Sequence, residues 1–200
     1  PFYTLMLTIQ QSCIIKTVSM KRKILILGGG FGGIKTALEL AEDERFDVTL
    51  ISDRPDFRYY PALYRTATGG SRAQAHIPLE EIFKGKPVRV VHDKATRLDR
   101  DKKTLKGKTR TYSYDALVIA LGVVTNYFGI KGLKEYSFGI KSIEEASELK
   151  SHIHKQLLQN QKPDLNYIVI GGGPTGVELA GALPAYIKKV MKNHGVKHKA

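Results

Sequence analysis

The sequence of 200 residues contains one cysteine, Cys13. A single cysteine excludes an internal disulfide and a metal cluster held by cysteines. Because nothing requires an oxidising compartment, we expect a cytoplasmic protein. The sequence also lacks an apolar run as long as the roughly 20 residues of a membrane-spanning helix. Its 42% apolar and 26% charged residues are typical of a soluble globular protein with one or two domains.

Acidic residues are scarce. Asp and Glu number 19 against 32 Lys and Arg, which gives a net charge of +13. The basic residues gather in 102–110, which we expect at a hairpin tip, and after Glu178, where no acid follows. Such charge suits a nucleic acid or an anionic membrane surface. Since no nucleic-acid motif with interleaved aromatic residues accompanies it, we interpret it as solvated surface and expect no nucleic-acid partner.

Residues 24–40, ILILGGGFGGIKTALEL, read as a strand, a glycine run and a helix. The apolar run 24–27 predicts a strand buried on both faces. In the pattern G-x-G-x-x-G that follows, the first glycine makes a tight turn, the second admits a diphosphate and the third lets the helix approach the strand. The run comprises Gly28, Gly30 and Gly33 as pattern glycines, with Phe31 and Gly32 between the last two. The helix directs its N-terminal amides and dipole at the diphosphate.

An acid follows this loop at the spacing typical of a ribose contact. Asp53 stands twenty residues after Gly33, at the end of the predicted buried strand 47–51. Its carboxylate can accept hydrogen bonds from ribose hydroxyls. A strand before the loop, a helix after it and an acid at this place predict a dinucleotide site rather than a generic glycine-rich turn.

The same pattern returns in residues 167–183, YIVIGGGPTGVELAGAL. Residues 167–170 predict a buried strand that begins another sheet, and a helix should start near Pro174. The pattern falls on Gly171, Gly173 and Gly176, with Pro174 and Thr175 between the last two. Two such loops imply two dinucleotides, because each seats one diphosphate. An enzyme needs both when it passes electrons from a nicotinamide to a flavin that it also holds.

Strands and a short helix are predicted between the loops. Residues 54–70, RPDFRYYPALYRTATGG, carry four aromatic rings, which we expect in the core, although they could line a cofactor or an apolar channel. Residues 78–85 predict a short helix with proline in its first turn and glycine at its end. Alternating residues over 88–122 predict strands, the last of which, 116–121, is a buried strand ending at Gly122.

A helix is predicted from Ser142, because Ser142-x-x-Glu145 is a capping box and apolar residues recur along one helical face after it. His152 and His154 point to different sides of that helix, so they cannot share a metal, and we expect both in solvent. Pro184 should kink or interrupt the helix that follows the second loop.

Taken in order, these features resemble the two-dinucleotide-binding flavoproteins of the pyridine nucleotide-disulphide oxidoreductase superfamily. Within it the chain is similar to type II NADH dehydrogenase, the single-chain NADH:quinone oxidoreductase. The closer likeness extends from about residue 21 to residue 186 and rests on YYPALYRTATG (59–69), ALGVVTNYFGI (120–130), FGIKSIEEA (138–146) and GVELA (176–180). The resemblance implies an α/β fold: a Rossmann-like FAD-binding domain with a parallel sheet and a small antiparallel insertion, and the beginning of a second Rossmann-like domain for NADH.

The resemblance implies that FAD binds the first loop. Ala120 and Gly122 would lie in the segment that crosses close to the flavin, where the family has A-T-G and this chain has A-L-G. The family's ribose acid stands at the end of the second strand. That place falls on Ser52 or Asp53, with Arg54 beside them.

NADH would bind the second loop, and the resemblance directs attention to Glu178. Its carboxylate would orient the carboxamide of the nicotinamide, which holds the ring for reaction. The alternative is an acid that stabilises the N-terminus of its helix, and the two roles are compatible.

The resemblance divides the chain into three parts: an upstream extension (1–20), expected to be disordered; the first part of the FAD domain (21–140); and the start of an inserted NADH domain (141–200). We therefore expect an N-terminal fragment. Because no cysteine follows Cys13, electrons cannot leave through a protein disulfide, and the expected acceptor is quinone. A quinone acceptor would imply that the protein attaches to the inner face of the cell membrane. Three alternatives stay open. The acceptor could be ferredoxin or another small acceptor, the protein could be a basic binding module without enzymatic activity, and it could form a homodimer.

Overall fold

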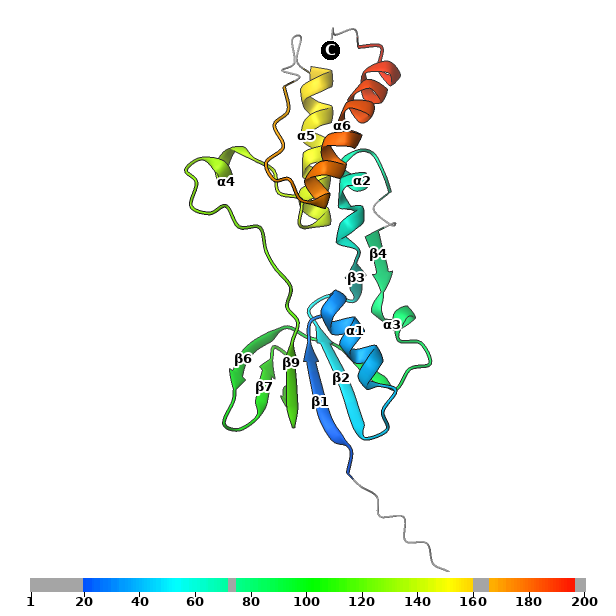
Figure 1. Cartoon of the computed structure of the whole chain (residues 1–200), viewed down its shortest axis with the longest axis vertical. Helices are drawn as coiled ribbons and strands as arrows, with labels where there is room; N and C mark the ends of the chain where they lie inside the picture. The colour runs from blue at the N-terminus through cyan, green and yellow to red at the C-terminus, as the bar shows by residue number, and fades with distance from the viewer. Residues whose placement is uncertain (1–19, 72–74, 160–165, 197–200) are drawn as a thin grey trace, which may run out of the picture.

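The computed structural model describes residues 20–71, 75–159 and 166–196. Its centre is a parallel sheet of four strands in the order β5-β2-β1-β9 (Figure 1). The strands are β1 (Arg22–Leu27), β2 (Phe46–Ser52), β5 (Val88–His92) and β9 (Ala116–Ile119). The extension expected over 1–20 lies outside the described residues except for Met20.

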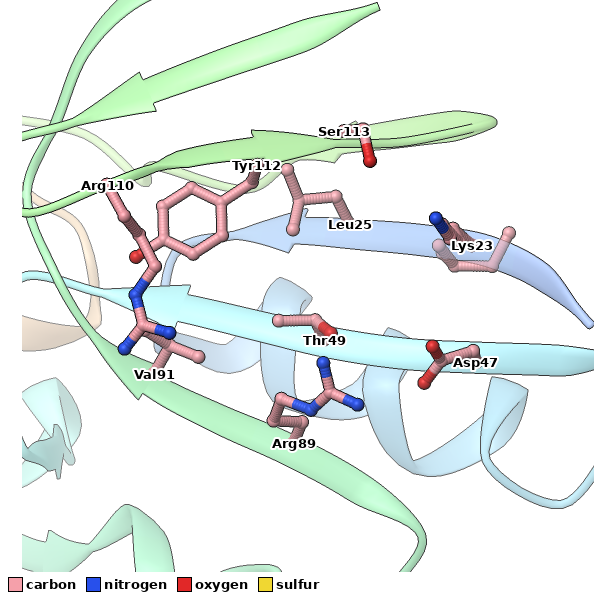
Figure 2. A pocket seen from close by; sticks show the side chains of 10 residues that line it. Lys23, Leu25, Asp47, Thr49, Arg89, Val91, Arg110, Tyr112 and Ser113 are labelled. Carbon is pink, nitrogen blue, oxygen red and sulfur yellow. The ribbon is translucent and has the colours of Figure 1, made fainter.

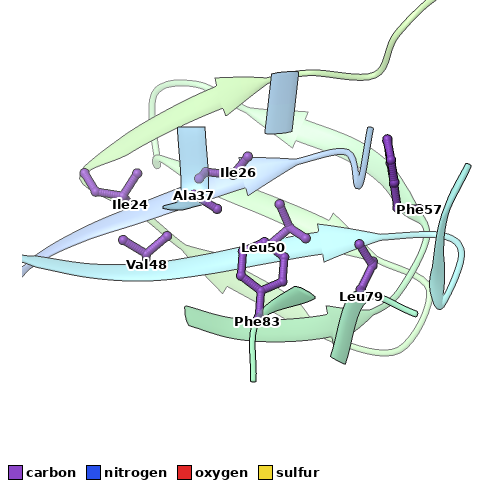
Figure 3. Close-up of a cluster of buried hydrophobic side chains, with 8 residues drawn as sticks. All are labelled: Ile24, Ile26, Ala37, Val48, Leu50, Phe57, Leu79 and Phe83. Carbon is purple, nitrogen blue, oxygen red and sulfur yellow. The ribbon is translucent and has the colours of Figure 1, made fainter. Parts of the chain in front are cut away.

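One face of this sheet is covered by α1 (Phe31–Leu40) and α3 (Leu79–Ile82). Alternate residues of β1 and β2 point toward these helices, as a strand period of two requires. The buried cluster consists of Ile24, Ile26, Ala37, Val48, Leu50, Phe57, Leu79 and Phe83 (Figure 3). Removal of these apolar side chains from water is the main stabilising contribution to this layer.

The other face is partly covered by a small antiparallel sheet of β6 (Ala95–Asp99), β7 (Thr104–Gly107) and β8 (Thr111–Ser113). Leu105 of β7 lies in one buried cluster with Leu25, Leu27, Ile51 and Val91 of the parallel sheet. The basic stretch 102–110 spans β7 and the turns on either side of it, so it covers two hairpin turns and a strand rather than the single hairpin tip expected. The predicted Rossmann-like arrangement with an antiparallel insertion is confirmed.

Residues 54–70 lead from the sheet to a helical part. β3 (Asp56–Arg58) pairs with β4 (His76–Pro78), and a 3-10 turn (Tyr60–Ala62) precedes α2 (Leu63–Ala67). The prediction that the rings of this segment lie in the core is correct for Phe57, which is 8% exposed. It is wrong for Tyr59 and Tyr60, which are 42% and 38% exposed, because the chain leaves the core where β3 ends.

The helical part combines α2 with α5 (Ile143–Gln159) and α6 (Pro174–Asn193), while α4 (Leu133–Tyr136) lies apart from these helices in the long connection after β9 (Figure 1). The predicted capping box opens α5: the Glu145 amide donates to Ser142 Oγ at 3.1 Å, and the Ser142 amide donates to Glu145 Oε2 at 3.0 Å. One apolar face of α5 is buried, first against α2 and then against α6. Within the described part of the chain, no helix combines the length and the apolarity needed to cross a membrane.

Two expectations for these helices are wrong in part. α6 continues through Pro184, because Leu183, Tyr186 and other residues around it stay buried against α5 and compensate for the lost hydrogen bond. His154 is half-buried rather than solvated, with its ring 6.1 Å from the ring of Tyr186, since α6 packs over it. His152 is exposed as expected.

The predicted buried strand 167–170 is also wrong. These residues are not part of any sheet among the described residues, and Ile168 and Ile170 are 87% and 68% exposed. A strand forms only where a neighbouring strand supplies its backbone hydrogen bonds, and no strand among the described residues pairs with 167–170. The predicted strand 116–121 does form as β9, but at the edge of the sheet, which leaves Ile119 60% exposed.

Candidate dinucleotide-binding sites

The first glycine loop joins β1 to α1 in the geometry that a diphosphate turn requires. Gly28 has a φ of +120°, and its amide donates to the Ile51 carbonyl at 2.8 Å. A Cβ at Gly33 would overlap the Gly28 carbonyl oxygen, so the third glycine allows α1 to approach the loop. A Cβ at Gly30 would meet no atom within 4 Å. The loop thus keeps open space at the start of α1, where helix amides can bind a phosphate.

The segment after β9 passes against this loop. The Ala120 amide donates to the Leu27 carbonyl at 2.8 Å, and a Cβ at Gly28 would overlap the Ala120 carbonyl oxygen. Gly32, in the first turn of α1, faces the Ala120 side chain at ordinary contact distance. Gly122 has a φ of +74°, so it turns the chain in the left-handed region that glycine favours. Residues distant in sequence therefore form one wall of the site.

The second loop repeats the geometry of the first. Gly171 has the same φ of +120° as Gly28. A Cβ at Gly176 would overlap the Gly171 carbonyl oxygen, and a Cβ at Gly173 would meet no atom within 4 Å. The first turn of α6 then begins with Pro174 and Thr175. The loop takes this conformation although 167–170 is not paired with a strand among the described residues.

Ser52 and Asp53 stand together at the end of β2 but in different surroundings. Ser52 is 5% exposed and lies beneath the loop, where its Oγ would be 2.8 Å from a Cβ at Gly29. The same Oγ accepts a hydrogen bond from the Arg54 amide at 3.2 Å. Asp53 is exposed directly after the strand. Of the two, only Asp53 carries a carboxylate that reaches the surface beside the loop.

Aromatic rings adjoin the first loop. Phe31 begins α1, is 51% exposed and meets the ring of Phe57 edge-on, with 4.8 Å between the ring centroids. The ring of Tyr59 lies 5.8 Å from that of Phe31. The part of the aromatic segment that leaves the core therefore forms an apolar surface next to the phosphate turn.

Glu178 lies in the second turn of α6 and is exposed. The first turn of α6 has no acidic residue, and the helix dipole loses its effect beyond that turn, which argues against a role in stabilising the N-terminus. Arg65 of α2 lies near enough for the charge of the Glu178 carboxylate to act on it. Its Nε donates to the Tyr64 hydroxyl at 3.1 Å, and this bond is the main cause that raises the pKa of Arg65, while the Glu178 charge adds a smaller contribution.

The sequence reasoning missed Arg65, because no local pattern signals a contact between α2 and α6. The two helices meet closely: a Cβ at Gly69, just after α2, would lie 3.0 Å from the Tyr186 ring of α6. Segments far apart in the sequence thus meet where the end of α2 lies against the middle of α6.

Asp93 was also missed. It follows β5, is 5% exposed, and its carboxylate accepts hydrogen bonds of 2.7–3.2 Å from the Lys94, Lys108 and Thr109 amides and the Thr109 and Tyr112 hydroxyls. These donors, with the two hydroxyls first, hold the pKa of Asp93 well below its usual range. The residue ties the end of β5 to the turn between β7 and β8, which is a structural role. An isolated Asp after a strand gives no signal for this network.

The chain spans about half the length of the relatives that it matches. The type II NADH:quinone oxidoreductase of Staphylococcus haemolyticus (strain JCSC1435) is 31% identical over 187 residues, which cover 88% of this chain and 46% of the relative. The protein of the same description from Staphylococcus aureus (strain NCTC 8325 / PS 47) is 32% identical over the same shares.

The fold has counterparts among solved structures. NDH2 from Plasmodium falciparum in complex with NADH aligns with a TM-score of 0.73 at 28% identity, over 88% of this chain and 39% of that one. The family described as pyridine nucleotide-disulphide oxidoreductase matches residues 22–197, which include both glycine loops. The resemblance seen in the motifs is confirmed, and the chain belongs to the pyridine nucleotide-disulphide oxidoreductase family.

Proposed function

We propose that the chain holds the adenosine diphosphate half of FAD on its first loop and that of NADH on its second. In the proposed reaction, NADH reduces the bound FAD by hydride transfer, and the flavin then passes electrons to a quinone. The relatives described as NADH:quinone oxidoreductases and the NADH complex of the Plasmodium relative support this assignment.

The observation that carries the proposal is the repeated loop. Gly28 and Gly171 share one backbone conformation, and the space beside Gly30 and Gly173 is open in both copies. Each loop ends at a helix N-terminus whose amides can bind a diphosphate. Two equivalent sites on one chain are what a transfer between two dinucleotides requires.

Residues around the first loop would complete the FAD site. Asp53 would accept hydrogen bonds from the ribose, while buried Ser52 supports the loop from below. Ala120 and Gly122 would bring backbone close to the flavin, and Phe31 would cover the diphosphate turn. Residues 21–140 would form the FAD part of this proposal.

At the second loop, Glu178 would accept a hydrogen bond from the nicotinamide carboxamide and so fix the orientation of the ring. Arg65, on the neighbouring α2, would add a positive charge near this carboxylate. The NADH part would begin with α5, near residue 141.

The acceptor follows from chemistry that the chain lacks. No cysteine follows Cys13 in these 200 residues, so no pair of thiols within them can accept the electrons. A quinone dissolved in the membrane would take them, which implies peripheral attachment to the inner face of the membrane. A small electron-transfer protein such as a ferredoxin is the alternative acceptor.

The test is an anaerobic stopped-flow measurement on the FAD-loaded protein. NADH should bleach the visible absorbance of the flavin, and a soluble ubiquinone analogue should restore it. If NADH leaves the absorbance of bound FAD unchanged, the proposal is wrong. If ferredoxin restores the absorbance and quinone does not, the alternative acceptor replaces quinone.

A further inference from the structure

The face of the parallel sheet opposite α1 changes from apolar to charged along its strands. Its rows follow from the register of β1, β2 and β5. The row nearest the glycine loop is apolar and buried, and it consists of Leu27, Ile51 and Val91. The rows nearer the strand starts carry polar side chains, namely Thr49, Arg89, Lys23 and Asp47.

A cavity of about 210 Å³ lies over these polar rows. The parallel sheet forms its floor, and residues just before and within β8 reach over it from the small antiparallel sheet (Figure 2). Arg110 and Tyr112 belong to this overhanging part, while Arg89 and Asp47 rise from adjacent strands of the floor.

The charges around the cavity are unbalanced. Its lining has three cationic side chains, Lys23, Arg89 and Arg110, against one carboxylate, Asp47, so three minus one leaves +2. Among the described residues, none of these four side chains forms an ion pair. Cations in excess of the single carboxylate repel one another, and a bound anion relieves that repulsion.

We propose that this cavity binds a phosphomonoester dianion. Such a group carries a charge of about −1.5 to −2 near neutral pH, which matches the excess charge of the lining. One Arg guanidinium can donate two parallel hydrogen bonds to phosphate oxygens. Arg89 and Arg110 approach the cavity from two different sheets. The Thr49 hydroxyl adds a neutral donor on the floor.

The overhanging part is fixed in place before any ligand arrives. The Gly107 amide donates to the Arg110 carbonyl at 2.8 Å, and the Tyr112 hydroxyl donates to Asp93 at 2.7 Å. The Arg110 guanidinium lies 5.8 Å from the centroid of the Tyr112 ring, within cation–π distance. Fixed donors lose little entropy on binding, which favours a real site over a chance cluster of charges.

This site is separate from both glycine loops. Lys23 and Gly28 stand near opposite ends of β1, and five residues of strand span roughly 16 Å. The cavity also opens on the face of the sheet away from α1 and its phosphate turn. Failure of this proposal would therefore leave the proposed dinucleotide sites untouched.

The test is isothermal titration of inorganic phosphate into the whole chain at about pH 7.5, where the dianion prevails. One phosphate should bind per chain at this site. Arg89→Met should weaken binding by about tenfold or more, because it removes a charge-assisted contact. Asp47→Asn should tighten binding several-fold, because it removes the only negative lining charge. Arg97→Met, on the exposed surface of β6, is the matched control and should change nothing.

The expected changes in phosphate affinity have opposite signs in Arg89→Met and Asp47→Asn. This keeps the test independent of folding, since a misfolded variant cannot bind phosphate more tightly. Phosphate that binds a glycine loop instead would be insensitive to both Arg89→Met and Asp47→Asn, and that result overturns the proposal. Sedimentation with phosphatidylcholine vesicles containing phosphatidic acid then distinguishes a lipid headgroup from a soluble phosphomonoester as the source of the bound phosphate. Co-sedimentation that Arg89→Met abolishes identifies a lipid headgroup, and phosphate binding without co-sedimentation identifies a soluble phosphomonoester.

Discussion

Gly28 and Ala120 lie in direct backbone contact, so closely that a Cβ at Gly28 would overlap the Ala120 carbonyl oxygen. This contact joins the phosphate turn after β1 to the crossing segment after β9. It exists because β1 and β9 are parallel neighbours, which places their carboxyl ends side by side. Gly28 therefore serves both the turn and the packing between two strands.

Gly28→Ala should destabilise the fold by about 3 kcal/mol, because the new methyl group meets a backbone atom and φ is +120°. Gly30→Ala is the matched control. Its φ of −91° suits alanine and its surroundings are open, so stability should fall by no more than about 1 kcal/mol. Urea denaturation followed by circular dichroism measures both changes.

The same two variants separate an effect on folding from an effect on FAD binding. Gly30→Ala should weaken FAD binding about tenfold or more, because its methyl group fills the space proposed for the diphosphate. Fluorescence titration of FAD gives the affinity. An unchanged affinity in Gly30→Ala would remove the first loop from the FAD site.

Glu178→Gln should slow reduction of bound FAD by NADH about tenfold and leave FAD affinity unchanged. The residue is exposed, so the free energy of unfolding should change by less than about 0.5 kcal/mol. Stopped-flow bleaching of the flavin reports the reduction rate, and its dependence on NADH concentration reports affinity. Glu148→Gln, an exposed acid of α5, is the control. Equal rates and affinities in both variants would assign Glu178 no part in the reaction.

Asp93→Asn should lower the urea midpoint at neutral pH, because an amide cannot accept all the hydrogen bonds that converge on the carboxylate. The folded pKa of Asp93 lies below its ordinary value of 3.8, so its ionised form stabilises the fold above about pH 4. That stabilisation is lost as the pH falls below 3.8 toward the folded pKa.

The difference in urea midpoint between Asp93→Asn and the unmodified chain should therefore shrink as the pH is lowered from about 5 to about 2, because the pKa shift of Asp93 sets this range. Asp101→Asn, in the exposed turn after β6, is the control and should show no such dependence. A difference that stays constant over this range would contradict the assigned cause.

Ser142→Ala should destabilise the start of α5 by about 1 kcal/mol, because it leaves the Glu145 amide without its capping partner. Hydrogen exchange should accelerate in the first turn of α5. Ser147→Ala is the control: the Ser147 hydroxyl donates to the Ile143 carbonyl within the same helix, and alanine is the better helix former there. Equal exchange in both variants would show that the cap does not limit opening of the helix.

Local features of this protein were predictable from the sequence. The two glycine loops follow from residues that tolerate a positive φ or close backbone approach, and Gly171 has the same φ as Gly28 although no strand that the structure describes pairs with the residues before it. The capping box of α5 is equally local, since Ser142 and Glu145 satisfy each other's amides within one turn. Such features depend on neighbours in the sequence, which the sequence itself specifies.

Tertiary structure decided what depends on distant partners. Residues 167–170 have the composition of a buried strand, but they pair with no strand among the described residues, and Ile168 and Ile170 stay exposed. The approach of Arg65 to Glu178, the donors around Asp93 and the charged cavity over β1, β2 and β5 each join segments far apart in the chain. Hydrogen bonds and charges act only over a few ångströms, so their partners are known only once the fold has brought them together.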